Sequence, residues 1–287
     1  MTAQLSGAFA PVPTPLNAQD AVDAGAIRAH LAWLAQQGLT GALILGTNGE
    51  FASLSMAERK AAAYAAARGG RPKMKLMLGV GSCALPDALD MVKLAKEYDY
   101  DAALCAPPFY FRQATVQGLA EFFKRVLDAA KVPVLLYHIP QFTGVAISDE
   151  LIAAIGAHEN LAGVKDSTGD EAELARLVKT FAGKLYLIGN DKLVAAAYAA
   201  GAAGSITATA SVVPDLVEGV RKTPALQAKL NSVRSILEKF GLGPAVKAIL
   251  RKKGFGLYAS RPPLASLDPA AEKQLIAMLD MFGVVKW

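Results

Sequence analysis

Lys165 and Tyr137 are the residues of this chain whose types and places could do covalent chemistry. Lys165 ends the apolar run AGVK, and Tyr137 stands near the end of the run PVLLYH. An amine held among apolar walls is less readily protonated, and the neutral amine can attack a ketone carbonyl to form a Schiff base. A phenol beside it can carry protons to and from the bound molecule. The ordinary alternatives are an exposed lysine and a tyrosine that only packs in the core. The elements that hold the two residues therefore determine whether they can react.

A polar turn, GTNGE (46–50), follows the apolar run GALIL. Its two glycines are expected to allow backbone conformations closed to other residues, and the N–H groups around Thr47 and Asn48 could form a concave anion site. A carboxylate is the natural guest, with the Thr47 hydroxyl as a further donor. Glu50 is expected to anchor the turn and not to touch the ligand. The alternative is an ordinary tight turn with an incidental pair of glycines.

Short apolar runs alternate with longer amphipathic stretches that have the period of helices. The predicted strands cover 7–12, 41–46, 75–80, 102–106, 133–138, 162–165, 185–189 and 204–207. Strands that are apolar throughout and separated by helices indicate a parallel sheet covered by helices. Eight such units favour a closed (β/α)₈ TIM barrel over an open doubly wound sheet, and no GxGxxG follows the first strand to favour a dinucleotide-binding fold.

After residue 222 the pattern becomes helical only. We therefore predict a barrel domain over 1–222 and a helical C-terminal extension over 223–287. Active sites of such barrels lie at the C-terminal ends of the strands, which is where Lys165 and Tyr137 stand in neighbouring units. His138, the residue after Tyr137, should point the opposite way, into the helix layer, and is expected to be structural.

Composition narrows the class of protein. The 287 residues are 53% hydrophobic with a net charge of +5, and the basic residues are scattered, so a small anionic substrate is favoured over nucleic acid. The sequence shows no apolar stretch of spanning length and no secretory signal at the N-terminus. Two cysteines match neither a disulfide framework nor a zinc site. A cytoplasmic protein without a membrane segment is expected.

Several ordered motifs together resemble the dihydrodipicolinate synthase / N-acetylneuraminate lyase family, the pyruvate-dependent class I aldolases and lyases built on (β/α)₈ barrels. GTNGE stands where the family has a G-T/S-T-G-E loop, YHIP where it has Y-N-x-P, and GVKD where it has G-x-K. GND before a GA-x-G-x-I strand is also shared, and RPP (261–263) occurs near its usual C-terminal place. The resemblance covers nearly the whole chain.

The resemblance implies that Lys165 forms the Schiff base with a 2-oxo acid such as pyruvate and that Tyr137 is the proton-transfer phenol. Thr47, counted among both the catalytic and the substrate-binding residues, would hold the carboxylate of the 2-oxo acid together with Asn48. Ile206 would line the pocket opposite. No metal or organic cofactor is needed.

The resemblance also has an implication for assembly. Tyr110, in APPFYF, matches a family tyrosine that reaches across a dimer interface to complete the proton relay of a neighbour. A homotetramer, built as a dimer of tight dimers, is therefore implied.

Three departures from the family pattern concern the substrate. Asn48 replaces a threonine or serine, and His138 replaces the usual asparagine. Phe142, expected in the substrate-binding wall, stands where true dihydrodipicolinate synthases have an arginine that clamps the carboxylate of the aldehyde. Arg112 is the nearest arginine that could replace that clamp.

These departures favour a Schiff-base aldolase or lyase that acts on pyruvate and 2-oxo acids, with a 2-keto-3-deoxy sugar acid as substrate. The alternatives are a 4-hydroxy-tetrahydrodipicolinate (dihydrodipicolinate) synthase, which condenses pyruvate with aspartate semialdehyde, and a dehydratase of the same family. A non-catalytic sensor of sugar acids is a further possibility. The presence of both Lys165 and Tyr137 favours an enzyme, because a chain that only bound its ligand would not need the pair.

Overall fold

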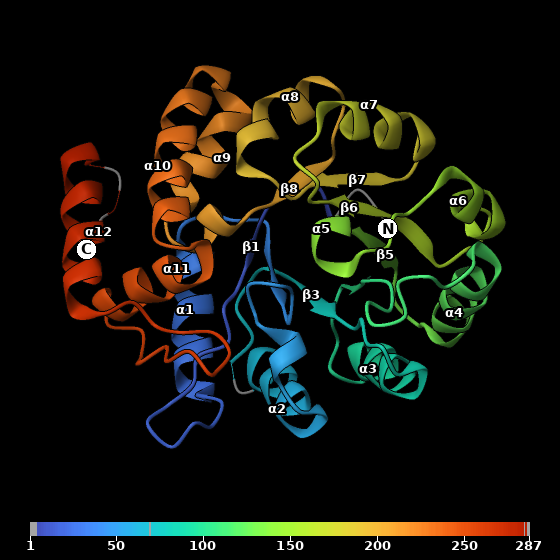
Figure 1. The fold of residues 1–287 in the computed structure, drawn as a ribbon, viewed down its shortest axis with the longest axis horizontal. Helices are drawn as coiled ribbons and strands as arrows, with labels where there is room; N and C mark the ends of the chain where they lie inside the picture. Colours follow the sequence, from blue (N-terminus) through green and yellow to red (C-terminus); the bar gives the residue numbers. More distant parts are fainter. Residues whose placement is uncertain (1–4, 69, 284, 286–287) are drawn as a thin grey trace.

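The computed structural model describes residues 5–68, 70–283 and 285. Within these residues eight parallel strands close into a barrel in chain order, which confirms the expected TIM barrel. The strands are β1 (Gly7–Pro11), β2 (Gly41–Ile44), β3 (Lys75–Gly79), β4 (Ala102–Cys105), β5 (Val134–His138), β6 (Leu161–Asp166), β7 (Leu185–Ile188) and β8 (Gly204–Ile206). Figure 1 shows them enclosed by helices.

The covering helices follow the strands one by one. They are α1 (Ala24–Gln36), α2 (Met56–Ala67), α3 (Leu85–Glu97), α4 (Val116–Ala129), α6 (Asp149–Ile155), α7 (Glu171–Thr180), α8 (Val194–Ala199) and α9 (Pro214–Lys222). A single helical turn, α5 (Pro140–Thr143), follows β5 directly. This turn was not predicted, because one turn of helix is too short to show a period in the sequence.

Successive side chains along each strand point alternately into the barrel and towards the helices, and both of these layers are apolar. Side chains such as Phe9, Leu43 and Leu135 fill the interior of the barrel, while neighbours such as Ala42 and Leu136 pack against the helices. Parallel strands covered on both faces read as continuous apolar runs for this reason.

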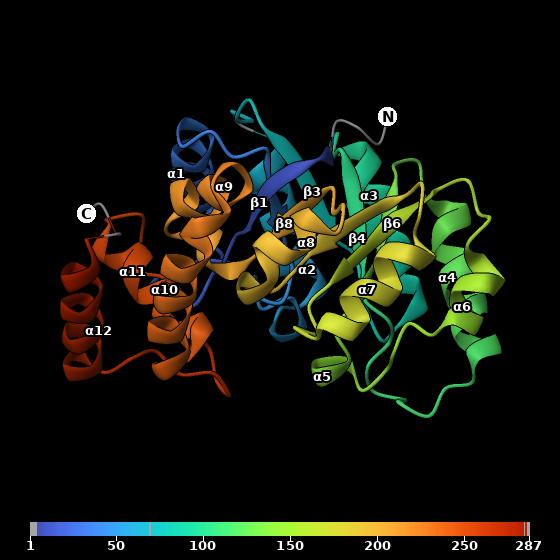
Figure 2. The same cartoon turned by 90° about the horizontal axis from the view of Figure 1, so that it is seen from above.

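Three helices follow the barrel, α10 (Gln227–Lys239), α11 (Leu242–Lys252) and α12 (Pro269–Phe282). In both views they lie together on one side of the barrel, with α10 and α11 next to α1 and α9, and α12 at the outer edge (Figures 1 and 2). Asp268 caps α12 by accepting a hydrogen bond from the backbone N–H of Ala271 at 2.8 Å, with Pro269 in the first turn. The domain boundary between 222 and 223 stays a prediction.

Two of the barrel helices begin with side-chain caps. Ser55 and Glu58 form a reciprocal capping box at α2. At α7, Asp170 accepts from the backbone N–H groups of Ala172 and Glu173, but the Glu173 carboxylate turns away from the cap. In the part of the chain that the structure describes, no helix combines the length and apolar character needed to cross a membrane.

Candidate active site

Lys165 and Tyr137 lie side by side at the C-terminal ends of β6 and β5. They are direct partners in the register between these strands, so their side chains leave the sheet on the same face. The Lys165 Nζ lies 4.1 Å from the centroid of the Tyr137 ring. Both side chains are buried, with 3% and 4% of their surfaces exposed. The barrel thus places an amine and a phenol together in a largely desolvated interior.

The phenol of Tyr137 belongs to a hydrogen-bonded chain. It shares a hydrogen bond of 3.2 Å with Thr47 Oγ1 and accepts one of 3.4 Å from the Ser167 hydroxyl. Burial alone would raise the pKa of Tyr137, but the charge of Lys165 and these hydrogen bonds outweigh burial and leave the pKa below its ordinary value. The phenol is therefore set up to exchange a proton. The sequence analysis missed Ser167, although its spacing of two from Lys165 is the signal for a shared face.

A second lysine, Lys247, is also buried, but its amine is paired. Lys247, on α11, is 1% exposed and forms an ion pair of 2.7 Å with Glu50, and it also donates to the carbonyl of Ala259. Burial lowers the pKa of Lys247, and the Glu50 carboxylate opposes that shift. Around Lys165, by contrast, no carboxylate of the described residues lies within ion-pair distance. Lys165 is thus the amine that faces a cavity without a counter-ion.

The backbone of the 46–50 turn corrects one expectation. The left-handed conformations belong to Leu45 and Glu50, with φ of 60° and 54°, and not to the glycines. Close approach explains the glycines instead, because a Cβ at Gly46 would lie 2.7 Å from a Leu43 methyl group and one at Gly49 only 3.0 Å from the Leu45 Cα. As expected, Glu50 anchors the turn, through its ion pair with the C-terminal extension.

A cavity of about 120 Å³ lies between these groups. Lys165, Tyr137, Thr47, Asn48 and Ile206 all contribute to its wall. The Asn48 Nδ2 is buried and has no hydrogen-bond partner among the described residues, so it is a donor available to a ligand. The 46–50 turn and the lysine–tyrosine pair therefore face one space.

Sequence reasoning missed several residues of this wall. Polar groups also come from Gln141 on α5, from Asn190 just after β7, and from Arg234 on α10. Gly189, in the GND motif, leaves room for the reactive side chains, because a Cβ there would lie 2.0 Å from Ser167 Oγ and 2.9 Å from Lys165 Cε. The motif was noted in the sequence, but the reason for its glycine is visible only in three dimensions.

Phe142 lies at the mouth of the site. Its side chain on α5 is 66% exposed and lines both the catalytic cavity and an adjoining, largely apolar cavity of about 280 Å³. Arg112 packs against the same segment, since a Cβ at Gly144 would lie 2.5 Å from Arg112 Cδ. Tyr110 is 77% exposed and is not part of the wall of its own chain's cavity.

His138 faces the helix layer, as expected. Its Nδ1 accepts a hydrogen bond from the backbone N–H of Ile147 at 3.1 Å, so the ring proton is on Nε2, which donates to Glu173 at 3.0 Å. Burial lowers the pKa of His138, against the opposing effect of nearby carboxylates, and this favours the neutral ring. The residue fixes β5 to α7 and does not enter the cavity.

Comparison with known proteins now adds a decisive observation. The model of the dihydrodipicolinate synthetase family matches residues 4–281. The chain belongs to this family. As a member of the dihydrodipicolinate synthetase family, it is a lyase or aldolase.

Relatives in the family carry different names. An uncharacterized DapA-like lyase of Chloroflexus aurantiacus is 37% identical over 77% of this chain and 77% of its own. A 4-hydroxy-tetrahydrodipicolinate synthase of Saccharophagus degradans is 30% identical over 92% of this chain and 94% of its own. The names of these members of the dihydrodipicolinate synthetase family do not agree on one substrate.

Solved structures with a similar fold include proteins that carry other names. A Sulfolobus 2-keto-3-deoxygluconate aldolase in complex with D-KDPG superposes with a TM-score of 0.90 at 24% identity, covering 98% of this chain and 100% of the other. CdNal of Clostridium difficile, in complex with mannosamine, gives a TM-score of 0.92 at 21% identity, covering 97% and 99%. At these identities the likeness concerns the fold alone.

Proposed function

We propose that this member of the family is a class I aldolase that forms a Schiff base through Lys165 and acts on 2-keto-3-deoxy sugar acids. One observation carries the proposal. The Lys165 amine is buried in a cavity, without a carboxylate partner among the described residues, against a tyrosine whose phenol contacts two further hydroxyl groups. An amine of this kind is a nucleophile for a ketone, and the phenol is a proton carrier.

The cleavage reaction balances as follows. The amine attacks the C2 carbonyl of the sugar acid, and water leaves with a proton supplied by Tyr137, which forms an iminium and leaves the phenolate. The phenolate takes the proton of the C4 hydroxyl, the C3–C4 bond breaks, and its electron pair moves into the iminium to give an enamine and a free aldehyde. Tyr137 passes that proton to C3, and hydrolysis of the iminium releases pyruvate and the amine and returns a proton to the phenolate. The lowered pKa of Tyr137 supports its part as the base.

The 46–50 turn is proposed to hold the carboxylate of the 2-oxo acid. Thr47 supplies a hydroxyl, and Asn48 supplies the buried Nδ2 that lacks a partner. Ile206 is proposed to pack against the other side of the bound acid, because it contributes to the same wall. Thr47 also supports the phenol of Tyr137, so it serves both binding and proton transfer.

The acceptor end of the cavity favours a hydroxylated aldehyde. Gln141, Ser167 and Asn190 place polar groups in the wall, and they suit the hydroxyls of a sugar chain. Phe142 cannot form the charge-assisted contacts that an arginine makes with a second carboxylate. The fold shared with a 2-keto-3-deoxygluconate aldolase is compatible with this substrate class.

The synthase remains the second candidate for a specific reason. Arg112 packs against Gly144, two residues after Phe142, and its guanidinium could replace the missing clamp. Relatives named 4-hydroxy-tetrahydrodipicolinate synthase include one that is 30% identical over 92% of this chain. Condensation of pyruvate with aspartate semialdehyde is therefore the competing activity to measure.

Tyr110 is proposed to act in a neighbouring chain. Its ring projects into solvent, whereas the apolar cavity beside Tyr137 and Thr47 is lined by Phe51, Phe109 and other apolar side chains. An aromatic ring from a second copy of the chain is a chemically suitable occupant. A homotetramer assembled from such dimers is part of the proposal.

The test is the release of pyruvate from a panel of 2-keto-3-deoxy sugar acids, measured beside condensation of pyruvate with aspartate semialdehyde. We expect cleavage of at least one sugar acid with a higher kcat/KM than the condensation. A clear preference for the semialdehyde would restore the synthase. Binding of sugar acids without any turnover would point to a sensor.

A further inference from the structure

The C-terminal extension reaches the 46–50 turn through a buried ion pair. Lys247, in the middle of α11, places its Nζ 2.7 Å from the Glu50 carboxylate, and the two side chains are only 2% and 10% exposed. The same amine donates to the carbonyl of Ala259, in the segment between α11 and α12. One lysine thus joins two parts of the extension to the turn that follows β2.

Hydrogen bonds also hold the turn, among them one of 2.8 Å from the backbone N–H of Ser53 to the carbonyl of Glu50. The backbone N–H of Glu50 donates to the carbonyl of Thr47 at 2.9 Å and closes the turn. The Thr14 hydroxyl donates to the carbonyl of Gly49 at 2.7 Å from the barrel side. Glu50 itself has left-handed backbone angles, which a non-glycine residue keeps only where its surroundings hold it.

The groups that depend on this turn are those proposed to bind and react. Thr47 lies 3.2 Å from the phenol of Tyr137, and Asn48 directs an unpaired donor into the cavity wall. Both residues precede Glu50 within a single turn, so a small change in its backbone moves both. A misplacement of this size is costly in an enzyme site, since rate depends steeply on the alignment of reacting groups.

A buried ion pair is a poor device for stability alone. Removing both charges from water has a free-energy penalty that offsets much of their mutual attraction. A pair of apolar side chains could fill the same space. An ion pair, however, fixes direction, because the lysine must meet both a carboxylate and a carbonyl. The pair is therefore better explained by what it positions.

We propose that Lys247 is a positioning residue that holds the 46–50 turn, through Glu50, in the geometry that binds the carboxylate of the 2-oxo acid and supports Tyr137. The inference rests on the proposed function for the identity of the ligand. The C-terminal extension already contributes Arg234 and Leu242 to the wall of the cavity, and the proposal adds Lys247, which lies outside that wall and acts through Glu50.

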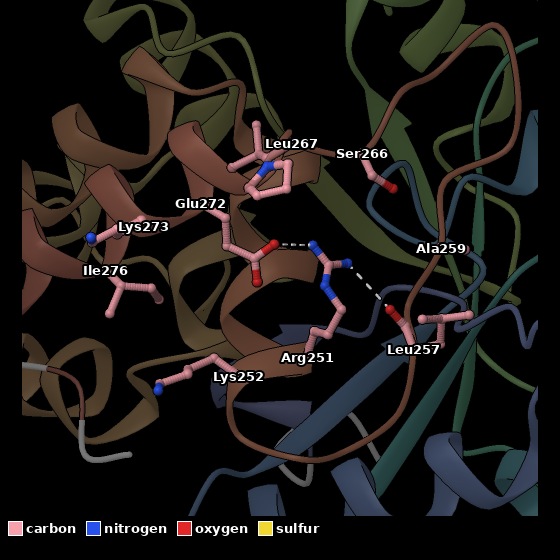
Figure 3. Close-up of a pocket in the computed structure, with 10 residues that line it drawn as sticks. Arg251, Lys252, Leu257, Ala259, Ser266, Leu267, Glu272, Lys273 and Ile276 are labelled. Atoms are coloured by element: carbon pink, nitrogen blue, oxygen red, sulfur yellow. Dashed lines mark hydrogen bonds and ion pairs between the residues drawn. The ribbon is translucent and has the colours of Figure 1, made fainter.

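The matched control lies one turn further along the same helix. Arg251 also forms a partly buried ion pair, with Glu272 at 2.7 Å, and donates to the carbonyl of Leu257 at 3.2 Å (Figure 3). Arg251→Met removes a charge and its ion pair from α11 without touching the 46–50 turn. Lys247→Met removes the equivalent charge and frees the turn.

The first measurement is the pyruvate concentration that gives half-maximal borohydride trapping. We expect Lys247→Met to raise it about tenfold or more, as for the loss of one charge-assisted hydrogen bond, and Arg251→Met to leave it nearly unchanged. Amide hydrogen exchange should become faster over residues 46–53 in Lys247→Met alone. Equal behaviour of the two variants in both measurements would overturn the proposal.

A double variant separates positioning from the cost of an unpaired charge. Lys247→Met combined with Glu50→Leu leaves no lone charge, so its unfolding transition should return towards that of the wild type, while pyruvate affinity stays low and exchange at the turn stays fast. Recovery of both affinity and slow exchange would show that the pair is merely structural. The double variant also tests the proposal if Lys247→Met alone does not fold.

The outcomes keep the two proposals apart. If the wild type traps no pyruvate, the proposed function fails, and hydrogen exchange over 46–53 still decides whether Lys247 holds the turn. If the wild type traps pyruvate but the double variant traps it with the same half-maximal concentration, the positioning role fails and the proposed function stands.

Discussion

In the proposed reaction, Tyr137 takes the proton of the substrate hydroxyl. Its phenol touches Thr47 and Ser167, and its pKa lies below the ordinary value. Tyr137→Phe removes the proton carrier but leaves the amine and the cavity wall. We expect kcat for sugar-acid cleavage to fall by about 10²–10⁴-fold, while pyruvate still forms a reducible adduct on Lys165. Unchanged kcat in this variant would remove Tyr137 from the mechanism.

Gly189 makes room for the amine. A methyl group at this position would lie 2.0 Å from Ser167 Oγ and 2.9 Å from Lys165 Cε. We therefore expect Gly189→Ala to slow the trapping of pyruvate by about tenfold or more, because both side chains must move. Gly243→Ala is the control, since, outside its chain neighbours and its own helix backbone, no atom of the described residues lies within 4 Å of the Cβ it would add. Equal trapping rates in the two variants would contradict the packing argument.

Phe142 is proposed to govern the choice of aldehyde. A charge-assisted contact contributes roughly 1.5–3 kcal/mol, so Phe142→Arg should raise kcat/KM for aspartate semialdehyde by about one to two orders of magnitude. The same change should not help a neutral glyceraldehyde-type acceptor. Side-by-side kinetics with both aldehydes measure the effect. An equal response of the two acceptors would mean that position 142 does not face the distal group.

At the scale of elements, much could be predicted from the sequence. Apolar runs of strand length located all eight strands of the barrel, and neighbouring units placed Tyr137 beside Lys165. The sequence did not predict contacts between residues that are far apart in the chain, nor the space that a missing side chain leaves. The Lys247–Glu50 pair and the space at Gly189 depend on how separate elements meet, and no spacing in the chain encodes them. The turn α5 was too short to leave a pattern.

His30 joins α1 to the rest of the molecule. It is fully buried, donates through Nε2 to the carbonyl of Ser211 at 2.9 Å, and receives the Tyr258 hydroxyl at Nδ1. Burial lowers the pKa of His30 from 6.5 to about 4, against the hydrogen bond to Ser211. The folded protein therefore binds this proton less readily than the unfolded chain.

Acidification should therefore destabilise the folded protein. Stability from His30 is fully present above pH 6.5 and is lost as the pH falls towards 4, by up to about 3 kcal/mol. His138 contributes in the same direction, because burial lowers its pKa as well. The measurement is the free energy of unfolding in urea, for the wild type and for His30→Gln, at pH values from 7 to 4. This range spans the lowered pKa of His30 and its ordinary value. A variant that loses as much stability on acidification as the wild type would contradict the prediction.

At the scale of the whole molecule, the exposed Tyr110 predicts that sites are completed between chains. We expect Tyr110→Phe to lower kcat much more than pyruvate trapping, because a proton path matters mainly in the transition state. Mixing this variant with Lys165→Ala under conditions of subunit exchange should restore activity, since one site then has both an intact lysine and a neighbour's intact tyrosine. A fully active monomer, or no recovery on mixing despite exchange, would contradict it.

The most direct test of the account is to incubate the wild type with pyruvate and borohydride and to map the labelled peptide by mass spectrometry. Reduction traps only an iminium, which requires a neutral and accessible amine. Two lysines of the described residues are buried, and they make the test discriminating, because Lys247 is paired with Glu50 and Lys165 faces the cavity. We predict a single pyruvyl adduct on Lys165. Label on Lys247 or another lysine, or no label at all, would contradict the Schiff-base mechanism.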